Sequence, residues 1–271
     1  MKEQTINIDN HSINLKKWEV LGSSNNIYVA HGLGEHGGRY EDFALHFNQL
    51  GFNVYAHDHR GHGKSSGTRG HISSFSVYSD DLKKVIECTS KPDSVNYLLG
   101  HSLGGVIAAG FLLRYPSIIT KSVFSAPGFE KKIPPNAIKA GMGKLLANIF
   151  PKLTLWNEIE AEWICSSKKV VETYKNDPLV HDRVSAKFFT SFLAEYINIK
   201  NNFSKISNPL LMLIPGSDII VNHKVSKSLF RTLNSKNTKL VEYSDSYHEL
   251  LNEEKTRPLA YVEIESWLKN K

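Results

Sequence analysis

The sequence predicts an α/β protein: a mostly parallel sheet of eight strands flanked by helices, with an inserted helical cap. Two observations lead to this fold class. Short apolar runs rich in β-branched residues alternate with segments of helical periodicity, which is typical of a parallel sheet covered by helices. Residues 129–205 interrupt this alternation, because they contain no convincing buried strand. The length of 271 residues suits one large domain with such an insertion.

Eight short runs predict the strands of the sheet. The first two belong to a weakly alternating hairpin, residues 5–20, with a polar turn at Asp9 and Asn10. The weak alternation and the polar turn predict an antiparallel hairpin at the edge of the sheet. The remaining six strands are predicted at residues 26–30, 52–56, 95–99, 122–125, 210–214 and 239–243.

Helices are predicted between these strands. The first carries apolar residues at helical spacing from Tyr40 to Leu50, and Gly51 stands where a C-terminal glycine cap is expected. The next three are predicted at residues 78–88, 106–114 and 258–268.

The cap is predicted from a second apolar pattern. Six side chains would line one helical face: Met142, Leu145, Leu146, Ile149, Phe150 and Leu153. Pro151 is expected to end or bend this helix. We therefore expect a core of residues 1–128 and 206–271, with a cap of residues 129–205. The apolar face could form a trough for a lipid chain, rest on micelles or membranes, or pack onto the core.

Composition excludes several classes of protein. With 41% apolar and 22% charged residues, the chain is neither disordered nor fibrous. The net charge of +6 comes from scattered lysines without a dense basic block, so nucleic acid is not an expected partner. Two distant cysteines provide neither a disulfide framework nor a zinc site. No apolar signal segment or spanning run is present, so a cytoplasmic protein is expected.

The pentapeptide Gly-His-Ser-Leu-Gly at residues 100–104 follows a predicted strand and precedes a predicted helix. Small flanking residues allow a sharp turn there, which exposes the Ser102 hydroxyl at the end of the sheet. The helix N-terminus beneath it favours developing negative charge. Ser65 lies in a second Gly-x-Ser-x-Gly sequence, but neither a strand nor an apolar helix flanks it. Ser102 is therefore the predicted nucleophile.

A serine nucleophile requires a base and an acid that orients the base. On this fold the acid precedes the histidine along the chain. Asp218 directly follows a predicted strand, and His248 lies just beyond the last strand. Asp245 competes for the role of acid, but it lies only three residues before His248 and need not face it. Asp218 is preferred because chain order and strand-end placement both select it.

An oxyanion hole requires two N–H groups directed at the developing oxyanion. The amide of Leu103, directly after the nucleophile, is one candidate. The amide of Leu33, in the glycine-rich loop after the third strand, is the other.

A metal site is not expected. Three histidines, His57, His59 and His62, show ligand-like spacing, but Arg60 lies among them and no cysteine supports them. A structural loop is the preferred interpretation. We expect neither a metal nor an organic cofactor.

Several motifs together resemble the monoacylglycerol lipase and lysophospholipase branch of the α/β-hydrolases, over nearly the whole chain. They are His-Gly-Leu-Gly-Glu-His at 31–36, Gly-Arg-Tyr at 38–40, Asp-His-Arg-Gly-His-Gly at 58–63, Gly-Thr-Arg-Gly at 67–70, Gly-His-Ser-Leu-Gly-Gly at 100–105, Asn-Asp-Pro-Leu at 176–179, Gly-Ser-Asp at 216–218 and Tyr-His at 247–248. The resemblance implies an α/β-hydrolase fold that cleaves esters of single-acyl-chain lipids through an acyl-enzyme. It also implies Ser102, Asp218 and His248 as catalytic residues.

The resemblance further implies that Glu35, Arg39, His101 and Tyr174 lie at the polar end of the site, where the headgroup and leaving alcohol bind. For Glu35 and Arg39, a buried pair that braces the loop is an equal alternative. The chain differs from mammalian lipases at Leu251, where those enzymes carry a further histidine.

Three other functions stay open. A short-chain carboxylesterase and an amide hydrolase would use the same groups, and a catalytically silent ligand-binding protein would retain the fold.

Overall fold

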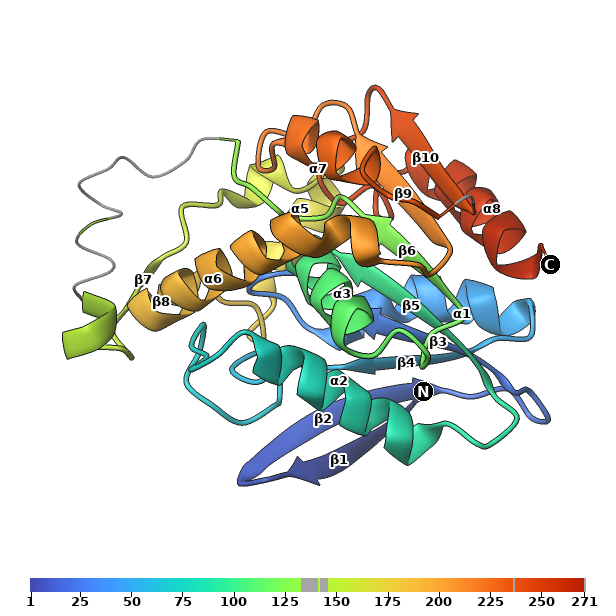
Figure 1. Ribbon diagram of the computed structural model, residues 1–271, viewed down its shortest axis with the longest axis horizontal. Helices are drawn as coiled ribbons and strands as arrows, with labels where there is room; N and C mark the ends of the chain where they lie inside the picture. Colours follow the sequence, from blue (N-terminus) through green and yellow to red (C-terminus); the bar gives the residue numbers. More distant parts are fainter. Residues whose placement is uncertain (133–140, 142–145, 236, 271) are drawn as a thin grey trace.

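The computed structural model describes residues 1–132, 141, 146–235 and 237–270. Its centre is one eight-stranded sheet in the order β1-β2-β4-β3-β5-β6-β9-β10 (Figure 1). The expected hairpin of β1 (Lys2–Ile8) and β2 (His11–Trp18) is antiparallel and lies at one edge. The β2 strand also runs antiparallel to β4, and the other neighbouring strands are parallel. The predicted mostly parallel sheet is thus confirmed.

The six remaining strands overlap the predicted runs. They are β3 (Asn25–Ala30), β4 (Asn53–His57), β5 (Val95–His101), β6 (Lys121–Ser125), β9 (Leu210–Pro215) and β10 (Thr238–Tyr243). Every residue of β4 and β9 is buried, because helices cover both faces of the sheet. The edge strand β10 has no buried residue: two of its residues are exposed and the other four are half-buried.

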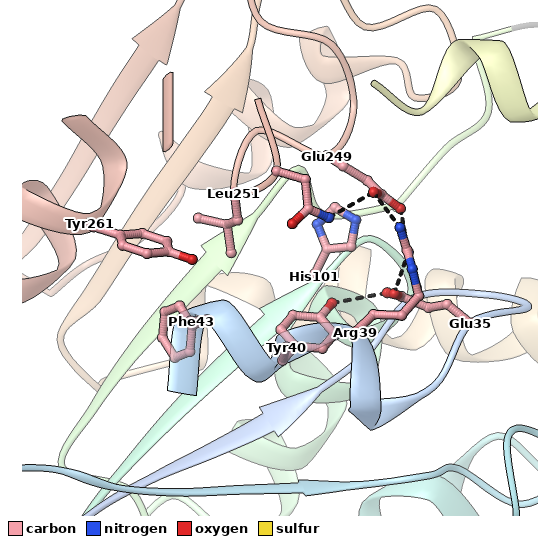
Figure 2. Close-up of a pocket in the computed structure, with 9 residues that line it drawn as sticks. Glu35, Arg39, Tyr40, Phe43, His101, Glu249, Leu251 and Tyr261 are labelled. Atoms are coloured by element: carbon pink, nitrogen blue, oxygen red, sulfur yellow. Dashed lines mark hydrogen bonds and ion pairs between the residues drawn. The ribbon is translucent and has the colours of Figure 1, made fainter. Parts of the chain in front are cut away.

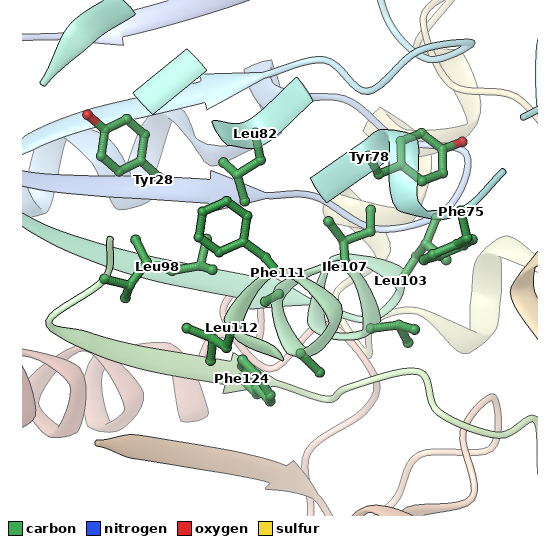
Figure 3. Close-up of a cluster of buried hydrophobic side chains, with 14 of the residues drawn as sticks. Tyr28, Phe75, Tyr78, Leu82, Leu98, Leu103, Ile107, Phe111, Leu112 and Phe124 are labelled. Atoms are coloured by element: carbon green, nitrogen blue, oxygen red, sulfur yellow. The ribbon is translucent and has the colours of Figure 1, made fainter. Parts of the chain in front are cut away.

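Helices divide between the two faces of the sheet. On one face, α1 (Glu41–Gln49) and α8 (Thr256–Lys269) cover the strands through a core that includes Phe47 and Ile264. On the other face lie α2 (Ser76–Thr89), α3 (Leu103–Arg114), α6 (Ala186–Asn202) and α7 (His223–Phe230). Figure 3 shows Leu82 and Phe111 of this second core beside Tyr28 and Leu98 of the strands. The α7 helix was not predicted, since its eight residues carry too short an apolar pattern.

The segment between β6 and β9 contains η2 (Ala161–Trp163), α5 (Lys168–Asn176), α6 and η3 (Phe203–Lys205). It also contains a small antiparallel ribbon of β7 (Thr154–Trp156) and β8 (Arg183–Ser185). The ribbon differs from the expectation of an all-helical segment. Its strands have only three residues each and are largely exposed, so they lack the apolar run that marks a buried strand.

The apolar face predicted for this segment is only partly described. Met142 and Leu145 lie outside the described residues. Residues 146–149 are helical, and this helix ends before Pro151 as expected. Ile149 and Phe150 are 58% and 59% exposed, so these side chains are not packed onto the core.

The sheet brings the predicted site residues to one edge. Parallel strands β3, β5 and β9 end at the loops that carry Leu33, Ser102 and Asp218. The loop after β10 carries His248. Functional groups in open α/β sheets gather at this carboxyl edge. Among the described helices, none has the length and apolar character that crossing a lipid bilayer requires.

Candidate active site

Ser102 occupies a sharp turn between β5 and α3. Its backbone has φ 52° and ψ −117°, a conformation that is strained for a residue with a side chain. The turn is held by hydrogen bonds from the Ser102 amide to the Ser125 carbonyl (3.0 Å) and from the Gly128 amide to the Ser102 carbonyl (2.9 Å). A Cβ atom on Gly104 would overlap the carbonyl oxygen of Ala30. Glycine is therefore required at that position for α3 to approach β3.

Three predicted side chains meet at this turn. The Nε2 atom of His248 lies 2.9 Å from the Ser102 hydroxyl, and its Nδ1 atom lies 2.6 Å from Oδ2 of Asp218. An ionised carboxylate only accepts hydrogen bonds, so Nδ1 of His248 carries the proton. Nε2 then presents a lone pair to the serine hydroxyl. His248 can therefore take the proton of the Ser102 hydroxyl and make the serine oxygen a nucleophile.

Burial and mutual electrostatics set the protonation states of His248 and Asp218. Both side chains are buried. Burial opposes charge on His248, but the Asp218 carboxylate outweighs it and raises the pKa of the imidazole above 6.5. Burial would likewise favour neutral Asp218, yet the two histidines beside it hold the pKa of its carboxyl well below its usual range. The carboxylate thus stays ionised, and its charge favours a proton on the imidazole more than burial opposes it.

The loop that carries Leu33 lies against the serine. A Cβ atom on Gly32 would come within 3.4 Å of the Ser102 Cβ. Within the described residues, the Leu33 amide has no hydrogen-bond acceptor. Leu103 is the first residue of α3, where a helix N–H has no partner inside the helix. Leu103 thus adjoins the nucleophile, Leu33 follows a glycine that lies against it, and both amides are available to an incoming oxygen.

Glu35 and Arg39 belong to a buried ionic network (Figure 2). Arg39 donates two hydrogen bonds to Glu249 (2.6 and 2.8 Å) and one to Glu35 (2.7 Å). Glu35 also accepts from the Gly32 amide (2.6 Å) and the Tyr40 hydroxyl (2.9 Å). These contacts tie the Leu33 loop to the residue after His248. Glu249 was missed by the sequence analysis, because nothing local marks it as the partner of a residue 210 positions earlier.

His101 and Tyr174 lie beside this network. The ring centres of His101 and His248 are 5.1 Å apart, and burial together with His248 lowers the pKa of His101 to about 4. His101 is therefore neutral at physiological pH. The Arg39 guanidinium lies 4.8 Å from the centre of the Tyr174 ring, a cation–π contact. His101, Arg39 and Glu35 line a narrow cavity with Leu251 and Tyr261.

Two contacts join the inserted segment to the Leu33 loop. His36 Nε2 lies 2.8 Å from Asp177 Oδ2, and the His181 amide donates to the Gly34 carbonyl (2.8 Å). Burial disfavours the Asp177 charge, but His36 outweighs this effect and lowers the pKa of the carboxyl. The sequence analysis noted Asp177 only within a motif. Its partner is 141 positions away, so no local pattern reveals the pair.

The competing candidates lie elsewhere. Asp245 is exposed, whereas Asp218 contacts His248 directly. Ser65 is buried: its hydroxyl donates to the Asp58 carbonyl (2.6 Å) and accepts from the Asn14 amide (2.9 Å). Both hydrogen bonds of the Ser65 hydroxyl therefore stabilise the loop around it.

The histidines with ligand-like spacing are hydrogen-bonded within the protein. His59 contacts His57 (3.2 Å) and the His31 carbonyl (3.1 Å), and His62 contacts the Arg60 carbonyl (3.1 Å). Across the described ranges, one cluster has three converging ligand atoms: Asp218, His223 and His248. In this cluster both histidines already hydrogen-bond to the Asp218 carboxylate.

Sequence and structure comparisons agree with this geometry. Residues 23–255 match the Hydrolase_4 family, described as serine aminopeptidase, S33. A rat monoglyceride lipase is 30% identical, covering 98% of this chain and 89% of its own length. A Dictyostelium discoideum protein described as an uncharacterized abhydrolase domain-containing protein is 32% identical over 90% of this chain, which spans 26% of that protein. The crystal structure of Paleococcus ferrophilus monoacylglycerol lipase is 31% identical with a TM-score of 0.87, covering 94% of this chain and 98% of that one.

These similarities extend over the sheet, the turn at Ser102 and the loop of His248. The chain therefore belongs to the Hydrolase_4 family of α/β-hydrolases, as a carboxylic ester hydrolase that resembles monoacylglycerol lipases.

Proposed function

We propose that this enzyme hydrolyses esters of single-acyl-chain lipids, monoacylglycerols or lysophospholipids, through an acyl-enzyme at Ser102. The continuous hydrogen-bonded chain from Ser102 through His248 to Asp218 carries the proposal. The similarity to the rat monoglyceride lipase and the Paleococcus monoacylglycerol lipase supports the lipid class of the substrate.

The proposed reaction has two halves. His248 Nε2 takes the hydroxyl proton while Ser102 Oγ bonds to the ester carbonyl carbon. The amides of Leu33 and Leu103 stabilise the oxyanion, and His248 then protonates the departing alcohol as the C–O bond breaks. In the second half, His248 takes a proton from water as the water oxygen bonds to the acyl carbon. His248 then returns this proton to Ser102 Oγ as the acyl–serine bond breaks, which releases the fatty acid. No step needs a metal or an organic cofactor.

The polar end of the site has two proposed parts. His101 and Tyr174 would contact the headgroup or leaving alcohol. Glu35 and Arg39 would brace the Leu33 loop, because their charged atoms are satisfied by each other and by Glu249. The network supports this role over direct contact of Arg39 with the substrate, which would have to displace bonds to two carboxylates.

The proposed domain organisation keeps residues 1–128 and 206–271 as the core and residues 129–205 as the cap. All eight strands of the main sheet fall in the core ranges. The β7–β8 ribbon, α5 and α6 fall in the cap range. The loop between α5 and β8 contacts the Leu33 loop through Asp177 and His181, which would hold the cap over the site.

Acyl-chain length tests the proposed substrate. A chain buried in an apolar trough gains about 0.8 kcal/mol per methylene, or about fifteenfold in kcat/KM for each two-carbon step until the trough is filled. We expect kcat/KM on p-nitrophenyl esters to rise from acetate toward long chains. Monoacylglycerol and lysophosphatidylcholine should be better substrates than triacylglycerol. Background is measured with the Ser102→Ala variant.

A sharp optimum at acetate would contradict the lipid proposal and leave a short-chain carboxylesterase. Faster cleavage of matched amides than of esters would instead indicate a peptidase.

We also propose a cytoplasmic enzyme whose cap makes transient contact with membrane or micelle surfaces. Within residues 149–156 of the cap range, five large apolar side chains are more than two-fifths exposed: Ile149, Phe150, Leu153, Leu155 and Trp156. An exposed apolar cluster of this kind, with aromatic members, suits a lipid interface. Both cysteines, Cys88 and Cys165, are free thiols, which suits a reducing compartment.

Vesicle binding tests the contact. Phe150→Ser combined with Trp156→Ser should reduce co-sedimentation with mixed phosphatidylcholine–phosphatidylglycerol vesicles several-fold, because apolar area inserted into lipid is lost. Hydrolysis of a soluble ester should stay unchanged. Leu259→Ser with Val262→Ser is the matched control, since these α8 side chains are 62% and 64% exposed outside the cap range. Equal vesicle binding by both double variants would contradict the proposal.

A further inference from the structure

His223 shares the carboxylate that orients His248. Its Nε2 atom lies 2.6 Å from Asp218 Oδ2, the same oxygen and the same distance as Nδ1 of His248. His223 is the first residue of α7 and is 9% exposed. The sequence analysis did not consider it, because a histidine five residues after an aspartate matches no motif used there.

The carboxylate has no spare acceptor site. Its other oxygen, Oδ1, accepts hydrogen bonds from the amides of Ile220 (2.7 Å) and Val221 (3.2 Å). With His223 and His248, four N–H groups converge on a side chain that is completely buried. Two donors on each oxygen fix both the position and the rotation of the carboxylate plane.

The tautomer of His223 follows from its surroundings. Asp218 accepts, so Nε2 of His223 must carry the proton. Among the described residues, Nδ1 of His223 has no hydrogen-bond partner. A second proton there would be buried without an acceptor, which is costly. Burial accordingly lowers the pKa of His223 despite the adjacent carboxylate, and His248 and Lys227 act in the same direction.

We propose that His223 is a positioning residue: its neutral Nε2–H group fixes the Asp218 carboxylate so that His248 faces Ser102 in the reactive tautomer. The proposal rests on the catalytic roles proposed above. The hydrogen bond that His223 donates also withdraws electron density from Oδ2 of Asp218. This limits how strongly Asp218 stabilises the His248 imidazolium. Asp218, Glu249 and Glu35 raise the pKa of His248, and burial lowers it. Asp218 has the largest raising effect of the three, and it is the group to which His223 bonds.

Two substitutions of His223 separate the effect of its hydrogen bond to Asp218 from the effect of its side-chain shape. His223→Leu fills similar space without a donor, whereas His223→Gln places an amide N–H near the position of Nε2. We expect His223→Leu to lower kcat about tenfold with KM within about twofold, since the lost hydrogen bond is to a charged group but not to the substrate. His223→Gln should restore most of kcat.

The pH profile gives a readout that a merely structural role would not move. Hydrolysis requires neutral His248, so kcat/KM falls as pH drops through the pKa of His248, which lies above 6.5 in the wild type. Without the His223 donor, Asp218 binds the imidazolium more strongly. The midpoint of the acid limb should therefore rise by about half a pH unit in His223→Leu and return toward the wild-type value in His223→Gln.

The ¹⁵N chemical shifts of the wild-type histidines test the proposal without any variant. At pH 7, His223 should be the neutral Nε2–H tautomer; an Nδ1–H tautomer or an imidazolium would overturn the proposal. So would wild-type kcat and acid limb in folded His223→Leu, or a His223→Gln variant as slow as His223→Leu. Ser102→Ala is assayed in parallel, because turnover retained there refutes the proposed function itself, whereas a normal His223→Leu refutes only the role of His223.

Discussion

Ser102→Ala should lose nearly all ester hydrolysis while keeping the fold. Loss of a serine nucleophile in such a triad lowers kcat by about 10⁵- to 10⁶-fold, and the remaining rate comes from the oxyanion hole and substrate binding. The substitution removes a half-buried hydroxyl that hydrogen-bonds to His248, so stability should change little. Initial rates on a long-chain p-nitrophenyl ester, together with circular dichroism, measure both effects.

Ser65→Ala is the matched control, since Ser65 lies in the other Gly-x-Ser-x-Gly sequence. Its hydroxyl bonds to Asp58 and Asn14, so this variant should melt at a lower temperature yet keep its turnover per folded molecule. A Ser102→Ala enzyme with wild-type turnover would refute the proposed nucleophile.

Asp218→Asn should lower kcat by about 10⁴-fold through the wrong histidine tautomer. The amides of Ile220 and Val221 donate to Oδ1, so the single oxygen of an asparagine is held on that side. Its NH₂ group then faces His248 and donates to Nδ1. The proton of His248 moves to Nε2, where it blocks acceptance of the Ser102 proton.

Asp245→Asn serves as the control, because Asp245 is an exposed carboxylate three residues before His248. It should keep wild-type kcat. The opposite pattern, with loss in Asp245→Asn and full activity in Asp218→Asn, would show that the acid is misassigned.

Local patterns were sufficient for the sheet and for the residues that meet at its edge. A glycine-flanked serine between a strand and a helix has a specific backbone requirement, and the strained torsions of Ser102 fulfil it. Asp218 could be selected over Asp245 because strand ends converge in a parallel sheet. Both arguments depend on residues adjacent in sequence to a recognisable strand.

The features that the sequence did not reveal depend on contacts between residues far apart in the chain, or on elements too short to leave a pattern. Glu249 pairs with Arg39 across 210 positions, and this pairing decides whether the guanidinium faces the substrate or braces a loop. The β7–β8 ribbon is too short and too exposed to leave a periodic pattern. His223 sits at the start of the unpredicted α7 helix, so its approach to Asp218 could be seen only in three dimensions.

Labelling with a fluorophosphonate tests the central claim most directly. Ser102 Oγ should form a bond to phosphorus with loss of fluoride, and mass spectrometry should locate the adduct on the peptide that contains Ser102. Labelling should weaken as pH falls and His248 gains a proton, and Asp218→Asn should label far more slowly than the wild type. A folded enzyme that forms no adduct at Ser102, or forms it equally fast in Asp218→Asn, would contradict the account and favour a catalytically silent α/β-hydrolase fold.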